Sequence, residues 1–181
     1  MPLLPTISPL PSTLFTRRAS RALALACVLG SVGGAAIGQI FQGPDWKESD
    51  TPPPPAFDER RLVPIEMPSY MTLRFGVDPN TIVITDDGLV RYVVVASNKA
   101  GGATNAFYEG VRCATGEMKS YARYGSNGWD VLPNPEWKKM FTLNSSYTLL
   151  LSQQGICRGA APRGSVNEMV QRLKNPLPEV Q

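Results

Sequence analysis

The feature that most constrains this chain is a hairpin signal flanked by strongly apolar, β-branched segments. Asp87-Gly88 separates residues 81–85 (TIVIT) from residues 89–96 (LVRYVVVA). An Asp-Gly pair suits a two-residue type I′ turn, because both of its residues tolerate a positive φ. We therefore expect an antiparallel hairpin centred on this turn.

The expected turn also sets a register and two strand faces. It places Thr85 opposite Val90 and Val83 opposite Tyr92. The apolar side chains then fall on both faces: Val83, Val90, Tyr92 and Val94 on one, and Ile82, Ile84, Val93 and Val95 around Arg91 on the other. Apolar residues on both faces are typical of a central hairpin that is covered on each side.

Two further turn signals extend this pattern. Asp78-Pro79-Asn80 stands between residues 72–77 and 81–85 and predicts another hairpin. Asn127-Gly128 precedes residues 129–132 and predicts a tight turn into a short strand.

A second long hairpin is predicted around Ala114-Thr115-Gly116. Glycine at the third loop position is what a type I turn followed by a left-handed residue requires. The loop predicts that Cys113 lies near Glu117 and that Glu109 lies near Tyr121.

The C-terminal part changes to helical patterns. Asn144-Ser145-Ser146 resembles an N-cap before residues 147–157, although a strand is the alternative for 147–151. Residues 165–174 carry one apolar helical stripe, which we expect to pack against the domain. The predicted fold class is α+β, an antiparallel β-meander of five to six strands with C-terminal helical segments and one disulfide.

Residues 1–38 have the layout of a secretion signal. Three arginines precede the apolar run 22–38, no acidic residue occurs before Asp45, and Ala36-Ile37-Gly38 predicts cleavage before Gln39. Removing three of the 18 basic residues leaves 15 against 15 acidic ones, so the mature chain is expected to be neutral. The mild basicity of the whole chain therefore says little about partners.

The expected location is the periplasm. A retained N-terminal anchor, holding the chain on the inner membrane and facing the periplasm, is the alternative. Residues 22–41 are about long enough to span a bilayer, although glycines and serines reduce their hydrophobicity. We expect contact with a membrane only through this segment, and only if it is not cleaved.

Three segments are expected after the signal peptide: a Pro-rich lead segment at 39–63, a β-rich domain at 64–160, and a C-terminal tail with a short helix at 161–181. The four prolines at 52–55 favour an extended path, so the lead segment is expected outside the sheet, as a stiff spacer draped on the domain. The alternative is a Pro-rich ligand for a partner protein.

Cysteine usage agrees with export. Removing Cys27 with the signal leaves Cys113 and Cys157. Two cysteines in an exported domain most simply form one disulfide. A reactive thiol or metal ligand is the weaker alternative, because the chain has no histidine and no CxxC motif.

Several motifs together resemble one known family: RFGVD (74–78), DDGLVRYVVVASN (86–98), GATNAFYEGVRCATGE (102–117) and YARYG (121–125). They are similar to the CNP-one-like (cryptic neisserial protein-like) family of uncharacterised bacterial envelope proteins. Further matching features are Trp46-Lys47-Glu48, Trp129, Trp137 and Cys157. The resemblance implies an exported protein of Gram-negative bacteria, and it brings no activity, cofactor or catalytic residue. Gly76 departs from the alanine that the family pattern expects.

The absence of histidine restricts the available chemistry. It excludes Ser-His-Asp and Cys-His pairs and the HExxH zinc helix. Glu109, Glu117 and Arg112 are the remaining group that could converge as an acid-base or small-ligand site. The favoured interpretation is structural, with Glu109 paired to Arg91 or Arg112 and Glu117 capping its turn. No cofactor and no metal are expected.

The best candidate binding surface is a cluster of tyrosines and charged residues on the second hairpin: Tyr108, Glu109, Arg112, Glu117, Lys119, Tyr121, Arg123 and Tyr124. Tyrosine and arginine dominate binding hot spots, so an exposed patch of this kind suits an envelope protein or a cell-wall polymer. Nucleic acid is not expected as a partner, because the mature chain is neutral. The favoured hypothesis is a non-enzymatic envelope domain, and the alternative is a small-ligand binder or a histidine-independent enzyme.

Overall fold

The computed structural model describes residues 45–102 and 104–176, which belong to one compact unit. The expected signal peptide, its cleavage site and the start of the lead segment lie outside the described residues. None of the helices within the described ranges is long and apolar enough to cross a membrane.

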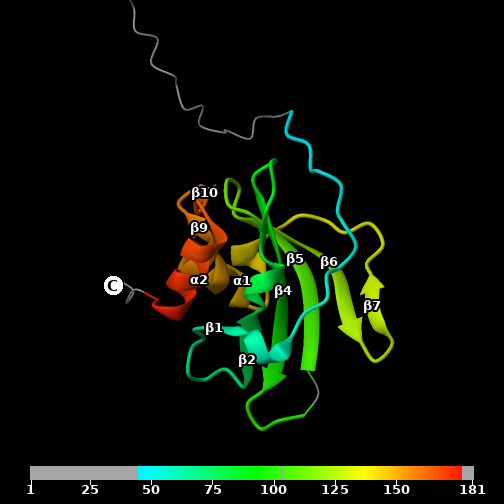
Figure 1. The fold of residues 1–181 in the computed structure, drawn as a ribbon, viewed down its shortest axis with the longest axis vertical. Helices are drawn as coiled ribbons and strands as arrows, with labels where there is room; N and C mark the ends of the chain where they lie inside the picture. The colour runs from blue at the N-terminus through cyan, green and yellow to red at the C-terminus, as the bar shows by residue number, and fades with distance from the viewer. Residues whose placement is uncertain (1–44, 103, 177–181) are drawn as a thin grey trace, which may run out of the picture. The chain divides into compact units, whose positions relative to one another are not determined.

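One antiparallel sheet forms the centre of this unit (Figure 1). Its main strand order is β1-β2-β4-β5-β6-β7, while β3 pairs with β4 and β8 pairs with β6. The eight strands are β1 (Val63–Ile65), β2 (Leu73–Val77), β3 (Val83–Ile84), β4 (Leu89–Asn98), β5 (Thr104–Arg112), β6 (Glu117–Gly125), β7 (Gly128–Val131) and β8 (Lys138–Lys139). The antiparallel, mixed α+β prediction is confirmed. The count of five to six strands is too low, because strands of two or three residues add to sheet edges without a periodic pattern.

Short helices and one small hairpin complete the described chain. They are the 3-10 helices η1 (Glu59–Arg61), η2 (Pro79–Thr81) and η3 (Met140–Thr142), helix α1 (Tyr147–Leu151), the π-helical turn η4 (Ser152–Ile156), the strands β9 (Cys157–Arg158) and β10 (Ala161–Pro162), and helix α2 (Val166–Lys174). The helix predicted at 165–174 is confirmed. The helix predicted at 147–157 forms as α1 followed by η4 and ends at Ile156, and its expected cap is not made, because the Ser146 side chain accepts no capping hydrogen bond. Ser165 caps α2 by accepting a hydrogen bond from the Glu168 backbone N–H.

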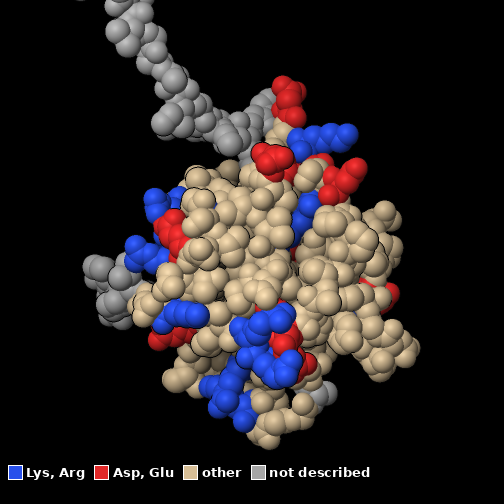
Figure 2. Space-filling view, in the orientation of Figure 1, with Lys and Arg blue, Asp and Glu red and all other residues tan. Residues whose placement is uncertain are grey.

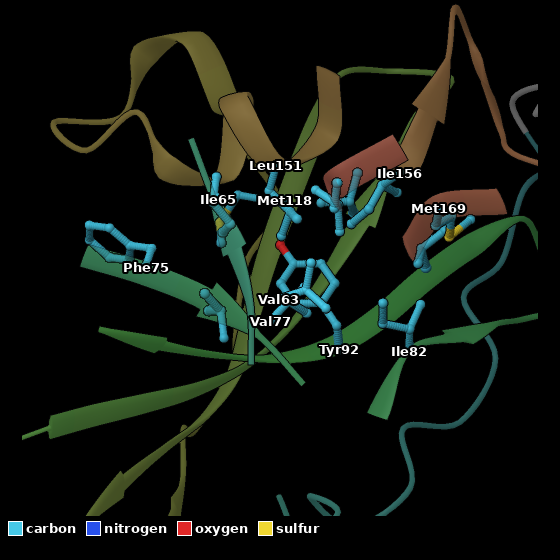
Figure 3. Packing of buried hydrophobic residues seen from close by; sticks show 14 of the residues in the cluster. Val63, Ile65, Phe75, Val77, Ile82, Tyr92, Met118, Leu151, Ile156 and Met169 are labelled. Carbon is cyan, nitrogen blue, oxygen red and sulfur yellow. The ribbon is translucent and has the colours of Figure 1, made fainter. Parts of the chain in front are cut away.

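Strand β4 lies inside the sheet and is covered on both faces, as its sequence predicts. Residues 89–96 are all buried. Tyr92 and Val94 join the cluster that packs against α1, η4 and α2 (Figure 3), whereas Val93 and Val95 join a smaller cluster on the opposite face. We call these the helix face and the lead face, because the lead segment covers the second one.

The hairpin before β4 has a different register from the predicted one. Its loop contains three residues, 86–88, since the Thr85 N–H donates to the Leu89 carbonyl at 2.9 Å and the Gly88 N–H to the Thr85 carbonyl at 3.0 Å. Only Gly88 takes a positive φ in this loop, at 81°, whereas a type I′ turn needs two such residues. Val83 therefore faces Arg91 instead of Tyr92.

This shift of one residue reverses the predicted faces of the first strand. Ile82 is buried on the helix face, and Val83 is 53% exposed. A shift of one residue has this effect because successive side chains of a strand point to opposite faces.

Asp78-Pro79-Asn80 does not close a hairpin, which corrects the prediction. These residues form a turn that continues as η2, and β2 and β3 both pair with β4, one after the other along the same edge. The Asp78 side chain caps this turn by accepting the Asn80 N–H. With ten residues, β4 is long enough to pair with both strands.

The second hairpin contains a β-bulge that the sequence prediction misses. Arg112 faces Glu117 and Glu109 faces Ser120, but beyond the bulge Tyr108 faces Ala122. Tyr121 is therefore the extra residue. The predicted pairings of Cys113 with Glu117 and of Glu109 with Tyr121 are both wrong already at the turn, because the loop holds four residues, 113–116, instead of three. The bulge turns the Tyr121 ring to the lead face, where it packs against Tyr108 with ring centroids 5.3 Å apart.

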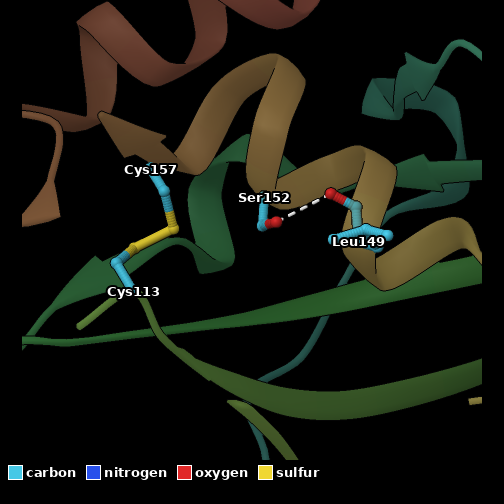
Figure 4. The surroundings of a disulfide bond; sticks show 4 residues. All are labelled: Cys113, Leu149, Ser152 and Cys157. Atoms are coloured by element: carbon cyan, nitrogen blue, oxygen red, sulfur yellow. Dashed lines mark hydrogen bonds between the residues drawn. A yellow bond between two sulfur atoms is a disulfide. The ribbon is translucent and has the colours of Figure 1, made fainter. Parts of the chain in front are cut away.

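The predicted disulfide joins Cys113 to Cys157, which are separated by 44 positions. It connects the turn after β5 to the end of η4 (Figure 4). Ser152, in the same turn of π-helix, donates to the Leu149 carbonyl at 2.7 Å. The disulfide thus ties the helical C-terminal part to the central hairpin.

Candidate functional site

The lead segment crosses the lead face beside β6, seen in cyan in Figure 1. Its Glu48 carboxylate is the centre of its contacts. It accepts hydrogen bonds from Lys119 Nζ at 2.6 Å, from Tyr121 Oη at 2.8 Å and from Trp137 Nε1 at 3.1 Å. The Arg91 guanidinium lies 3.8 Å away. A single carboxylate therefore joins β4, β6 and the segment that leads into β8.

Arg91 also holds the backbone of the lead segment. Its side chain is buried and donates to the Ser49 carbonyl at 2.7 Å and to the Asp50 carbonyl at 3.1 Å. From the hairpin turn, Asp87 Oδ2 accepts the Ser49 N–H at 2.6 Å. These bonds hold peptide groups, and Ser49 Oγ also accepts a longer hydrogen bond from Arg91, at 3.3 Å.

Trp46 completes this end of the contact. Its indole N–H donates to the Asp87 carbonyl at 2.9 Å, and the Arg112 guanidinium lies 3.7 Å from its ring centroid. A guanidinium over an indole is among the stronger cation–π arrangements. Its ring also meets Trp137 edge-on, with centroids 6.0 Å apart.

An aromatic groove lies at the other end of the lead face. Phe57 meets Tyr124 and Trp129 edge-on, at centroid distances of 5.1 and 5.8 Å. The groove has a volume of about 640 Å³ and is lined by Pro54, Ala56, Phe57, Asp58, Glu59, Tyr124 and Trp129. Tyr124 is 40% exposed, so part of this aromatic surface is open to solvent.

Basic side chains of η1 lie next to Asp58, which lines the groove. Figure 2 shows a largely uncharged central surface, with basic side chains grouped at the end where η1 lies. Asp58 pairs with Arg60 at 2.9 Å, and hydrogen bonds from Arg60 lower the pKa of Asp58 to about 2. The groove therefore keeps an ionised carboxylate at its rim.

The predicted binding residues divide between the two faces of the sheet. Tyr108, Arg112, Glu117, Lys119, Tyr121 and Tyr124 follow the lead face, and Glu109 and Arg123 follow the helix face. The expectation of an exposed patch is wrong for the central tyrosines. Tyr108 and Tyr121 are only 3% and 4% exposed, because sheet residues and the lead segment cover them.

Glu109 has an environment that the sequence does not predict. It is fully buried and accepts hydrogen bonds from three hydroxyl groups: Tyr147 Oη at 2.5 Å, Ser120 Oγ at 3.2 Å and Tyr92 Oη at 3.3 Å. Burial raises its pKa to about 7, and the three hydroxyl donors hold it below the value that burial alone would give.

The expected ion pair of Glu109 with Arg91 or Arg112 is therefore wrong, because both arginines lie on the opposite face of the sheet. Glu117 does form ion pairs, at 3.7 Å with Arg112 and 3.1 Å with Lys139. Glu109, Glu117 and Arg112 thus do not converge on one site.

A smaller cavity of about 260 Å³ lies beside β6 and the segment 132–138. Ser120 lines it and also donates to Glu109. Over residues 45–102 and 104–176, no three His, Cys, Asp or Glu side chains lie where they could share a metal ion.

Sequence reasoning missed the lead segment as part of the site. Two signals could have indicated it. Trp46 and Phe57 are aromatic residues in an otherwise polar, Pro-rich stretch, and Arg91 interrupts an apolar strand that is buried on both faces. A buried arginine needs acceptors, and residues 48–50 supply them.

Comparison with known proteins identifies the family. No curated protein and no solved structure matches the chain. A family model matches residues 41–174, a range that begins in the lead segment and ends with α2. The chain belongs to the CNP1-like family.

Proposed function

We propose that this chain is an exported, non-catalytic binding domain of the bacterial envelope, and that the aromatic groove binds a cell-wall polymer. The observation that carries the proposal is the groove itself, where Phe57, Tyr124 and Trp129 surround about 640 Å³. Aromatic rings offer faces on which the C–H groups of sugar rings can pack. Asp58 and Glu59 add carboxylate oxygens that can accept hydrogen bonds from sugar hydroxyls.

The non-catalytic part of the proposal rests on the separation of the polar groups. Glu109 lies among hydroxyl groups on the helix face, and Glu117 and Arg112 lie with each other on the lead face. A general acid and base must both reach the same reacting group. The three residues that the sequence offered for such chemistry are not arranged in this way.

The export part of the proposal is supported by the disulfide, because such bonds persist in oxidising compartments. The arrangement of residues 1–38 and the neutral composition after Gly38 agree with it. Cell fractionation and N-terminal sequencing test it. We expect a periplasmic protein that begins at Gln39, and a mature N-terminus that still contains Arg17 would contradict cleavage.

Co-sedimentation with purified peptidoglycan sacculi tests the groove. We expect the wild-type protein to sediment with the sacculi, and Trp129→Ala to reduce the bound fraction about tenfold, as loss of an aromatic hot spot does. Phe141→Ala is the matched control, because Phe141 is an aromatic residue that is 71% exposed and lies outside the groove. Equal binding of wild type and Trp129→Ala, or no binding by folded wild type, would overturn the proposed ligand.

A further inference from the structure

The contact of residues 46–50 with the sheet resembles a peptide bound in a groove. None of these residues belongs to a strand or helix, and none belongs to either buried hydrophobic cluster. Their contacts are made to side chains and to one turn carbonyl. This short segment therefore covers the domain without being part of its apolar core.

We call the surface under it the lead groove. It consists of Asp87, Arg91, Arg112, Lys119, Tyr121 and Trp137. It recognises three features of its occupant. Asp87 and Arg112 hold an indole, Lys119 and its neighbours hold a carboxylate two residues later, and Arg91 holds two successive backbone carbonyls.

The third feature indicates the chemical class of the occupant. Arg91 donates to the carbonyls of residues 49 and 50, and Asp87 accepts the N–H of residue 49. Consecutive carbonyl and N–H groups at this spacing occur in an extended peptide. Arg91 and Lys119 both approach one carboxylate, so the groove favours an acidic peptide.

The connection to the rest of the domain permits exchange of this segment. Thr51, Pro52 and Pro53 are exposed, and the prolines at 52–55 supply no backbone N–H donors. The next firm contact is made by Phe57. Residues 46–50 can therefore leave the lead groove while Phe57 and the sheet stay in place.

We propose that the lead groove is a peptide-recognition site, that residues 46–50 fill it as an internal ligand, and that a partner protein can replace them with an extended segment in which tryptophan precedes glutamate by two positions. This site is distinct from the aromatic groove, so the failure of one proposal leaves the other standing.

The test uses the full chain and a labelled peptide that spans residues 45–51 (DWKESDT). Trp46→Ala with Glu48→Gln releases the internal segment, and circular dichroism checks that the fold is kept. By fluorescence anisotropy, we expect the released chain to bind the peptide about tenfold or more tightly than the wild type does, since the internal ligand no longer competes.

Two matched peptides check the recognition. A peptide with Glu48→Gln should bind about tenfold more weakly to the released chain, because it loses the charge-assisted bonds to Lys119 and Tyr121. A peptide with Asp50→Asn should bind as the original does, because only the backbone carbonyl of Asp50 is held. A released chain that also carries Lys119→Ala should bind the original peptide about tenfold more weakly than the released chain does.

Three outcomes would overturn the proposal. One is a folded, released chain that binds none of the peptides. Another is equal binding of the original and Glu48→Gln peptides. The third is a wild-type dimer, detected by light scattering, that Glu48→Gln dissociates, because the occupant would then be the lead segment of a second copy.

Discussion

Burial of Glu109 should make the stability of the fold depend on pH below neutrality. Its pKa of about 7 in the folded protein exceeds the ordinary value of 4.5, mainly because of burial. The folded state therefore binds this proton more strongly than the unfolded state does. The stabilisation is complete below pH 4.5 and is lost as the pH rises to about 7, by about 3 kcal/mol in all.

Glu109→Gln should remove this pH dependence. The amide cannot ionise. Its oxygen can replace Oε1, which accepts from Tyr147 and Ser120, and its NH2 group can donate to the Tyr92 hydroxyl in place of Oε2. Urea unfolding at pH 5 and pH 8 measures the effect. Between pH 5 and pH 8, the wild type should lose about 3 kcal/mol of free energy of unfolding that the variant does not lose.

Glu117→Gln is the matched control for this measurement, because Glu117 forms ion pairs near the surface with Arg112 and Lys139. It should not gain stability relative to the wild type as the pH rises. The explanation is wrong if wild type and Glu109→Gln show the same change between the two pH values.

At the residue scale, the sequence indicated which side chains make long-range contacts, but it did not indicate which residues they contact. The Tyr and Arg cluster of the second hairpin does meet other parts of the chain, through Tyr121 and Arg112. The partners of Glu109 could not be predicted. The bulge at Tyr121 and the position of Tyr147, 38 residues away in the chain, depend on tertiary packing.

Among the elements, η4 and α2 approach most tightly where Gly155 faces Leu173. A Cβ built on Gly155 would lie 2.4 Å from Leu173 Cγ and 2.6 Å from Leu173 Cδ2. Such distances are far inside a normal carbon contact. The absence of a side chain at Gly155 therefore lets the two helical segments approach.

Gly155→Ala should lower the free energy of unfolding by about 1–3 kcal/mol, because overpacking forces α2 to move or Leu173 to leave its rotamer. Gly164→Ala, just before α2, is the matched control. Its Cβ would meet nothing closer than Glu168 Oε2 at 3.8 Å. Denaturant melts of both variants give the comparison, and equal midpoints for the two would contradict the packing argument.

The elements also show why the register was harder to predict than the strands. The apolar residues on both faces of β4 correctly indicated a central strand. The turn before it holds one residue more than expected, and the lead segment contacts that turn through Asp87. A local sequence signal does not contain such a distant contact. Strands as short as β8 have no detectable pattern at all.

Across the whole molecule, the disulfide is the main covalent constraint. It closes a loop of 44 residues. The chain-entropy model gives about 4 kcal/mol for a loop of this length. This is a large share of the stability of a small domain.

Cys113→Ser with Cys157→Ser should therefore lower the free energy of unfolding by about 4 kcal/mol, measured by urea denaturation. Wild-type protein in the presence of reductant should behave like the double variant. Alkylation of the denatured, unreduced wild type should leave both cysteines unlabelled, and labelling of Cys113 and Cys157 would show that the bond is absent.

The same disulfide limits how far the molecule can be stretched. When a force is applied between Asp45 and the end of α2, the residues between Cys113 and Cys157 cannot lengthen. The fully extended chain is therefore shorter by roughly 150 Å than it would be without the disulfide, at about 3.5 Å per extended residue. The lead segment lies outside this loop and is held to the sheet only by non-covalent contacts, from Trp46 to Phe57, so a load on that end can detach the segment without acting on the cross-link.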